Sequence, residues 1–167
     1  DGEGDTWNET TYLEASDGSI GDNFGAALDG HGQILAVGAP SANSVYVFQA
    51  GEEGWSEVAR ISASDSTAGL GKSVALTDDR LFVSTQNTVS VADGDTTATA
   101  AVHVFEQQGE DWTETTVLRG SQFSSGSGFG ASIVASSNDL LVSAPKESGG
   151  AVAAFRYQDG SWEETQT

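Results

Sequence analysis

The sequence predicts an all-β protein made of three repeated four-stranded antiparallel units, arranged as blades of the β-propeller type. Tryptophan marks the repeat, because Trp7, Trp55, Trp112 and Trp162 follow one another at intervals of about 50 residues. Between them, runs of β-branched and small apolar residues alternate with segments rich in Gly, Asp, Asn and Ser, which is typical of strands and turns. No window has the apolar period of a helix.

The first strand of each unit starts with a large apolar residue followed by glycine, in Phe24-Gly25, Leu70-Gly71 and Phe129-Gly130. Glycine there lets a neighbouring backbone approach, while the apolar side chain fills the space between blades. The second strand follows a short turn such as Asp29-Gly30, and it is predicted in residues 34–40, 81–84 and 140–145. These two strands are the most apolar of each unit, so we expect them nearest the central axis.

The third strand of each unit is predicted in residues 45–48, 102–105 and 152–155. A more polar run follows each tryptophan, in residues 8–13, 56–61, 113–118 and 163–165. We expect each tryptophan strand to be the outer strand of its blade, antiparallel to the run that ends in Phe48, Phe105 or Phe155. The indoles are predicted to pack between blades, and the alternative for them is a sugar-stacking platform.

These repeats divide the single domain, residues 1–167, into blades at residues 18–65, 66–122 and 123–167, with residues 1–17 as an outer strand from a preceding or shared blade. Three blades are fewer than the roughly four to eight that close a propeller ring. An open arc would expose apolar end faces, so we expect self-association or membership of a larger polypeptide or assembly. The alternatives are a compact monomer whose ends are covered by residues 1–17 and 87–101, and a twelve-stranded sandwich, which does not explain the repeat.

The charge of the chain excludes several classes of partner. Asp and Glu number 25 against 6 Lys and Arg, which gives a net charge of −19 at pH 7. Such a field repels phosphate backbones and anionic lipids, so neither nucleic acid nor membrane insertion is expected. With only two lysines, this surface is typical of a protein from a high-salt organism. The alternative is an acidic extracellular domain from an ordinary organism.

The first unit resembles the FG-GAP repeat of integrin α-subunit propellers and of many secreted microbial proteins. The resemblance rests on Phe24-Gly25 and on Gly38-Ala39-Pro40, and residues 16–25 and 58–65 resemble the microbial branch. It extends over essentially the whole chain, with the second and third copies degraded to Leu70-Gly71 with residues 84–86 and Phe129-Gly130 with residues 143–145. The resemblance implies a β-propeller.

Integrin-type repeats imply calcium in the hairpin between the first two strands, but this sequence departs from them there. The hairpins at residues 29–33, 77–80 and 136–139 lack alternating Asp residues, so no cofactor and no metal site is predicted. The remaining candidates for a weak calcium site or a partner contact are Asp17, Asp22, Asp93 and Asp95, which are otherwise solvated turn carboxylates. Asn8 starts a glycosylation sequon.

No catalytic arrangement emerges from the sequence. There is no G-x-S-x-G elbow and no cysteine, and residues 126–130 lack the lysine of a phosphate-binding loop. We therefore predict no enzyme, but a non-catalytic extracellular interaction or structural module of a cell surface, appendage or virus particle. Its propeller loops would bind a protein or glycan. The alternative is an accessory or catalytic domain of a glycan-active enzyme, with two carboxylates about 5–10 Å apart.

Overall fold

The computed structural model describes residue 9 and residues 11–63, 69–85, 100–109, 111–124 and 126–165. In these residues the chain forms three four-stranded antiparallel sheets and one short 3-10 helix, Pro40–Ala42, with no α-helix among them. This confirms the all-β fold and the three four-stranded antiparallel units. None of the described residues form a helix that is long and apolar enough to cross a membrane.

Each sheet is a simple meander in which strands follow one another in chain order. Sheet 1 contains β1 (Ala27–His31), β2 (Ile34–Ala39), β3 (Ser44–Gly51) and β4 (Gly54–Ile61). Sheet 2 contains β5 (Val74–Leu76), β6 (Arg80–Ser84), β7 (Val102–Gln108) and β8 (Asp111–Leu118). Sheet 3 contains β9 (Ile133–Ala135), β10 (Asp139–Ala144), β11 (Ala151–Gln158) and β12 (Ser161–Thr165).

The tryptophan strands β4, β8 and β12 lie at the edge of their sheets, in the order predicted for the outer strands. Each pairs antiparallel with the strand that carries the repeated phenylalanine, so that Trp112 faces Gln107 and Trp162 faces Tyr157. The pairing register shifts at that phenylalanine in sheets 1 and 2, where β4 and β8 each carry one extra residue, as in a β-bulge. A bulge strengthens the local twist, so the outer strand turns away from the flat centre of its sheet.

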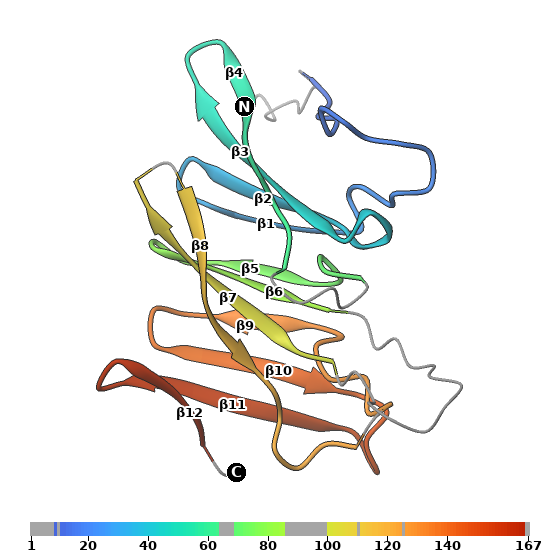
Figure 1. Cartoon of the computed structure of the whole chain (residues 1–167), viewed down its shortest axis with the longest axis vertical. Helices are drawn as coiled ribbons and strands as arrows, with labels where there is room; N and C mark the ends of the chain where they lie inside the picture. Colours follow the sequence, from blue (N-terminus) through green and yellow to red (C-terminus); the bar gives the residue numbers. More distant parts are fainter. Residues whose placement is uncertain are drawn as a thin grey trace, which may run out of the picture.

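The three sheets stack face to face in chain order (Figure 1). We call the face of a sheet that is turned toward the following sheet its trailing face, and the opposite face its leading face. The first two strands of each sheet make most of these contacts, since β1 and β2 lie against β5, and β5 and β6 lie against β9, while the outer strands β4 and β8 also touch. Apolar strands with alternating side chains need such stacking to bury both faces.

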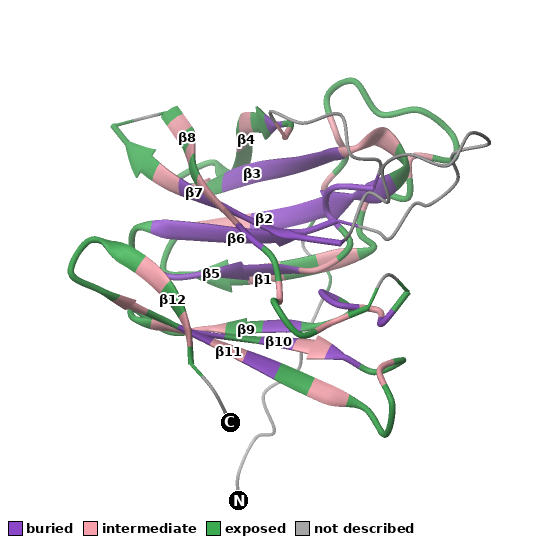
Figure 2. Cartoon of the chain, turned by 60° about the horizontal axis from the view of Figure 1, so that its bottom comes forward, coloured by how far each residue is buried: buried purple, intermediate pink, exposed green. Residues whose placement is uncertain are grey.

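Two apolar cores fill the spaces between the sheets. The first joins the trailing face of sheet 1 to the leading face of sheet 2 through Ala36, Val45, Val47, Leu81, Val83 and Phe105. The second joins sheet 2 to sheet 3 through Phe82, Val102, Val104, Leu140, Val142 and Phe155. Figure 2 shows the result, with β2, β3 and β6 largely buried, while β10 and β11 alternate between buried and exposed residues.

Gly38 of β2 and Gly71, which precedes β5, bring sheets 1 and 2 into close contact. A Cβ on Gly38 would overlap the Gly71 carbonyl oxygen, and one on Gly71 would lie 2.7 Å from the Ser44 carbonyl oxygen. Gly71 also has a φ of 97°, a conformation that favours glycine. The glycines of the Leu70-Gly71 and Gly38-Ala39-Pro40 motifs therefore permit the close approach expected from their positions.

The end faces of the stack, on sheet 1 and sheet 3, differ in how far other residues cover them. The leading face of sheet 1 is covered in part by the preceding segment, where the Phe24 ring lies edge-on to Tyr46 and Phe48 at centroid distances of 5.6 and 6.0 Å. Residues 11–17 of this segment contain no strand, and Trp7 lies outside the described residues. The trailing face of sheet 3 leaves Val134, Leu141 and Val152 exposed.

Candidate functional site

Loops gather along two opposite edges of the stack, and both edges carry sequence-predicted candidates. The hairpin edge holds the turns between the first two strands of each sheet, at residues 31–34, 77–80 and 136–139, on the left in Figure 1. The linker edge holds the segments that lead into each sheet, of which residues 13–26, 69–73 and 119–132 belong largely to the described chain.

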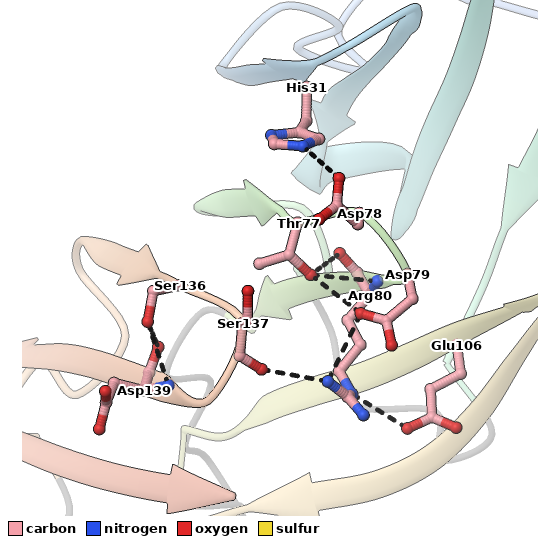
Figure 3. A network of polar contacts seen from close by, with 9 residues as sticks. All are labelled: His31, Thr77, Asp78, Asp79, Arg80, Glu106, Ser136, Ser137 and Asp139. Carbon is pink, nitrogen blue, oxygen red and sulfur yellow. Dashed lines mark hydrogen bonds and ion pairs between the residues drawn. The ribbon is translucent and has the colours of Figure 1, made fainter.

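The turns of the hairpin edge are bound to one another by polar contacts (Figure 3). His31 Nε2 lies 2.8 Å from Asp78 Oδ1, and Asp29 Oδ2 accepts a hydrogen bond of 2.7 Å from the Leu76 amide. Both contacts join sheet 1 to sheet 2. The carboxylates of these turns therefore serve to align neighbouring sheets.

Arg80 makes the corresponding connection from sheet 2 to sheet 3. Its Nε donates to Glu106 Oε1 at 3.1 Å and its Nη1 donates to the Ser137 carbonyl at 3.1 Å. Its Cζ also lies 4.4 Å from the centre of the Tyr157 ring, within the range of a cation–π contact. Across the described residues, no group of three or more His, Asp or Glu side chains is placed to share a metal ion.

Asp17 at the linker edge is held by side chains of sheet 1. The Tyr46 hydroxyl donates to Asp17 Oδ1 at 2.7 Å, and Arg60 Nη1 donates to Asp17 Oδ2 at 2.8 Å. Burial raises the pKa of the Tyr46 phenol, and the hydrogen bond to Asp17 raises it further. Both carboxylate oxygens of Asp17 are thus used within the protein.

The other predicted site residues are not brought to Asp17 by any described contact. Asp22 Oδ2 accepts a hydrogen bond of 2.7 Å from the Ser19 amide, which closes a local turn. Asp93 and Asp95 lie outside the described residues, and so does the predicted glycosylation residue Asn8.

A glutamate on each outer strand, two residues after the tryptophan, contacts either a linker or a neighbouring strand. Glu57 accepts hydrogen bonds from the Ser16 amide and hydroxyl at 2.8 and 2.9 Å, and Glu164 accepts one from the Ser121 amide at 2.8 Å. Glu114 Oε1 lies 3.1 Å from the buried His103 Nδ1. These residues are not among those predicted from the sequence, although a Trp-x-Glu spacing repeated in all three units marks them.

The linker edge also has a hollow of about 530 Å³ between residues 121–123 and sheet 3. Its two carboxylates are already hydrogen-bonded, Glu164 to Ser121 and Glu147 to the Ser124 amide and hydroxyl at 3.1 and 3.0 Å. These bonds from Ser124 lower the pKa of Glu147, because they stabilise its charged form. The hollow therefore offers no free charged group from these two residues.

A second pocket, of about 350 Å³, contains both lysines of the chain. It lies between sheets 2 and 3 at the linker edge and is lined by Lys72, Thr85, Gly128, Phe129, Gly130, Ala131, Pro145 and Lys146. The backbone on each side is anchored, since the Lys72 amide donates to the Ser84 carbonyl at 3.1 Å and the Lys146 amide to the Ser127 carbonyl at 2.8 Å. Both side chains are exposed.

The lysines differ from the arginines in how their charge is used. Arg60, Arg80 and Arg156 each form an ion pair with an acidic side chain, whereas neither lysine is ion-paired to a described residue. In a chain of net charge −19, two free ammonium groups at one pocket form a local exception. Such a site favours an anionic group over a cation. In the sequence, the rarity of lysine was the one sign of this pocket.

Comparison with known protein families matches residues 7–48 to the FG-GAP repeat. The matched segment contains both motifs on which the resemblance was based, Phe24-Gly25 and Gly38-Ala39-Pro40, together with β1, β2 and most of β3. No curated protein matches the chain at a significant level.

Proposed function

We propose, from the FG-GAP repeat that the chain carries in residues 7–48, that this protein is a non-catalytic interaction module whose loops bind an anionic group of a protein or glycan. The observation that carries the proposal is the pocket shared by Lys72 and Lys146. Backbone hydrogen bonds anchor both lysines beside the pocket, and the described carboxylates that the sequence singled out are engaged in internal contacts.

Carboxylate is the chemistry that the pocket would recognise. Two ammonium groups attract a carboxylate and donate hydrogen bonds to it, and a charged hydrogen bond contributes about 1.5–3 kcal/mol. The same group is available on a uronic-acid glycan and on an acidic peptide. The experiment must therefore compare both sources with a neutral ligand.

We expect oligogalacturonate or oligoglutamate to bind in moderate salt, and neutral maltohexaose not to bind. Replacing both lysines with glutamine, in K72Q/K146Q, should weaken binding about tenfold or more, since tenfold corresponds to about 1.4 kcal/mol. Isothermal titration calorimetry measures the affinities, and the preferred ligand identifies the class of partner. A matched control is R156Q, because Arg156 is exposed and paired with Asp139 away from the pocket.

Unchanged affinity in K72Q/K146Q, or binding of maltohexaose as tight as that of the acidic ligands, would contradict the proposal. Shortening of the oligogalacturonate during the titration would instead support the alternative of a glycan-active enzyme.

We also propose that the protein works outside the cell in concentrated salt, on a cell surface, appendage or virus particle. The support is its charge, with 25 acidic against 6 basic residues. Repulsion among these carboxylates opposes the compact state, and at about 1 M salt the screening length falls to about 3 Å.

The thermal midpoint of unfolding at pH 7 should therefore rise steadily from low salt into the molar range of KCl. Each kcal/mol of repulsion that is relieved raises the midpoint by about 2–4 °C for a domain of this size. Calorimetry at a low protein concentration measures this, and the control is the same series near the pI of about 4.1, where little net repulsion remains to be screened. A midpoint at pH 7 that stays flat or falls would remove the argument for a high-salt habitat.

A further inference from the structure

The sheet registers identify equivalent positions in the three sheets. Leu35, Leu81 and Leu140 each pair with the repeated phenylalanine of the next strand. The residue after each of these leucines lies on the trailing face, so Ala36, Phe82 and Leu141 are equivalent. By the same register, Val45, Val102 and Val152 are equivalent on the third strand.

The trailing face of sheet 3 is exposed, although the equivalent faces of sheets 1 and 2 are buried. Ala36 and Val45 in sheet 1, and Phe82 and Val102 in sheet 2, are fully or almost fully buried beneath the sheet that follows. The equivalent residues of sheet 3, Leu141 and Val152, are 47% and 52% exposed, and Val134 beside them on β9 is 63% exposed. Clustered exposed apolar residues of this kind mark an interaction surface.

The leading face of sheet 1, at the other end of the stack, also exposes residues whose equivalents in sheets 2 and 3 are buried. Leu28 is 67% exposed, whereas its equivalents Val74 and Ile133 are buried against the preceding sheet. Trp112 packs on the core between sheets 1 and 2, and Trp162 on the core between sheets 2 and 3, but their equivalent Trp55 is 39% exposed.

The glycines that precede each sheet also indicate that sheet 1 lacks a neighbour on its leading face. A Cβ on Gly71 would meet Gly38 of the preceding sheet, and one on Gly130 would meet Ser84 of the preceding sheet at 2.8 Å. A Cβ on Gly25, the equivalent glycine of sheet 1, would meet nothing within 4 Å. Gly25 thus leaves room for a close approach that no described residue makes.

We infer that the trailing face of sheet 3 binds the leading face of sheet 1 in a second copy of this chain. The trailing face of sheet 3 lacks a leading face to cover it, and the leading face of sheet 1 lacks a trailing face. A junction of these two faces would therefore repeat the contacts that join sheet 1 to sheet 2 and sheet 2 to sheet 3. The Phe24 ring over the leading face of sheet 1 does not prevent this, because the equivalent Phe129 is itself part of the core between sheets 2 and 3.

Each junction is head-to-tail, since different surfaces meet on the two copies. Two copies that join at both ends form a closed ring of six sheets, a number within the range of about four to eight that closes a propeller. The charge of −19 on each copy opposes the contact, so association requires concentrated salt. The inference concerns the ends of the stack and is independent of the lysine pocket.

Light scattering after size exclusion in molar KCl tests the inference. The expected mass is twice the 17.2 kDa of one chain, and it should fall toward a single chain as salt is removed. Leu141→Glu on the trailing face and Leu28→Glu on the leading face should each abolish the dimer, because both junctions of the ring contain the altered face. Val58→Glu is the matched control, because Val58 is 46% exposed on β4 and belongs to neither set of end residues.

Mixing the two variants separates a head-to-tail contact from other arrangements. The intact leading face of the Leu141→Glu chain can still bind the intact trailing face of the Leu28→Glu chain, so the mixture should form one-to-one dimers weaker than the ring. A symmetric contact between two trailing faces would leave Leu28→Glu dimeric and the mixture without mixed dimers. Either that result, or a wild-type chain that stays monomeric in molar KCl, would overturn the inference. Circular dichroism in the same salt confirms that each exposed substitution leaves the fold intact.

Discussion

Gly38→Ala is expected to lower the free energy of unfolding by about 3 kcal/mol, at the upper end of the usual cost of overpacking. The added methyl group would overlap the Gly71 carbonyl oxygen of the next sheet. That oxygen belongs to the backbone, so it cannot rotate away as a flexible side chain would. The contact is tight on both sides, because a Cβ on Gly71 would lie 3.0 Å from the Ala39 amide nitrogen. Sheets 1 and 2 must therefore move apart, which loosens the core between them.

Urea unfolding followed by circular dichroism measures this change. The matched control is Gly51→Ala near the end of β3, where the new Cβ would lie 3.6 Å from the Gly54 carbonyl oxygen, an ordinary contact. We expect a change within about 0.5 kcal/mol there, as for most surface substitutions. If Gly38→Ala were as stable as the wild type, the close approach of the two motifs would not be needed for folding.

Phe82→Ala is expected to cost about 3–5 kcal/mol, the range for removing a buried aromatic side chain. Phe82 is fully buried between sheets 2 and 3, and the Trp162 ring meets it edge-on at a centroid distance of 5.4 Å. Its removal leaves a cavity and also takes away the partner of the indole.

Leu141→Ala is the control that the repeat itself provides. Leu141 has the same register position in sheet 3, but no sheet covers it. In low salt, where the chain is expected to be monomeric, its replacement should cost less than about 1 kcal/mol. Equal costs for the two substitutions, measured by urea unfolding under these conditions, would mean that the end face is covered in the single chain.

Local sequence determined the strands and their order. Short apolar runs that are rich in β-branched residues and bounded by turn residues favour strands of a few residues, and hairpin connections make neighbours in sequence neighbours in the sheet. For this reason the outer position of Trp55 and Trp112 follows from the sequence. The Phe24-Gly25 and Gly38-Ala39-Pro40 motifs identified the repeat for the same reason, since each lies within one short segment.

Contacts between sheets were decided only by the tertiary structure. Asp17 reads in the sequence as a solvated turn carboxylate, yet Tyr46 and Arg60, which lie far along the chain, occupy both of its oxygens. Lys72 and Lys146 come to one pocket because sheets 2 and 3 stack there. Side-chain chemistry within a segment does not encode such distant neighbours.

The burial of equivalent residues shows most clearly what the sequence of one strand does not determine. Phe82 and Leu141 occupy the same position in strands of the same pattern, and one is buried while the other is exposed. Alternation along a strand determines which side chains share a face of the sheet, because successive side chains point to opposite sides. Whether that face is buried depends on a second sheet that covers it, and only the stacking of the whole chain decides where such a sheet is present.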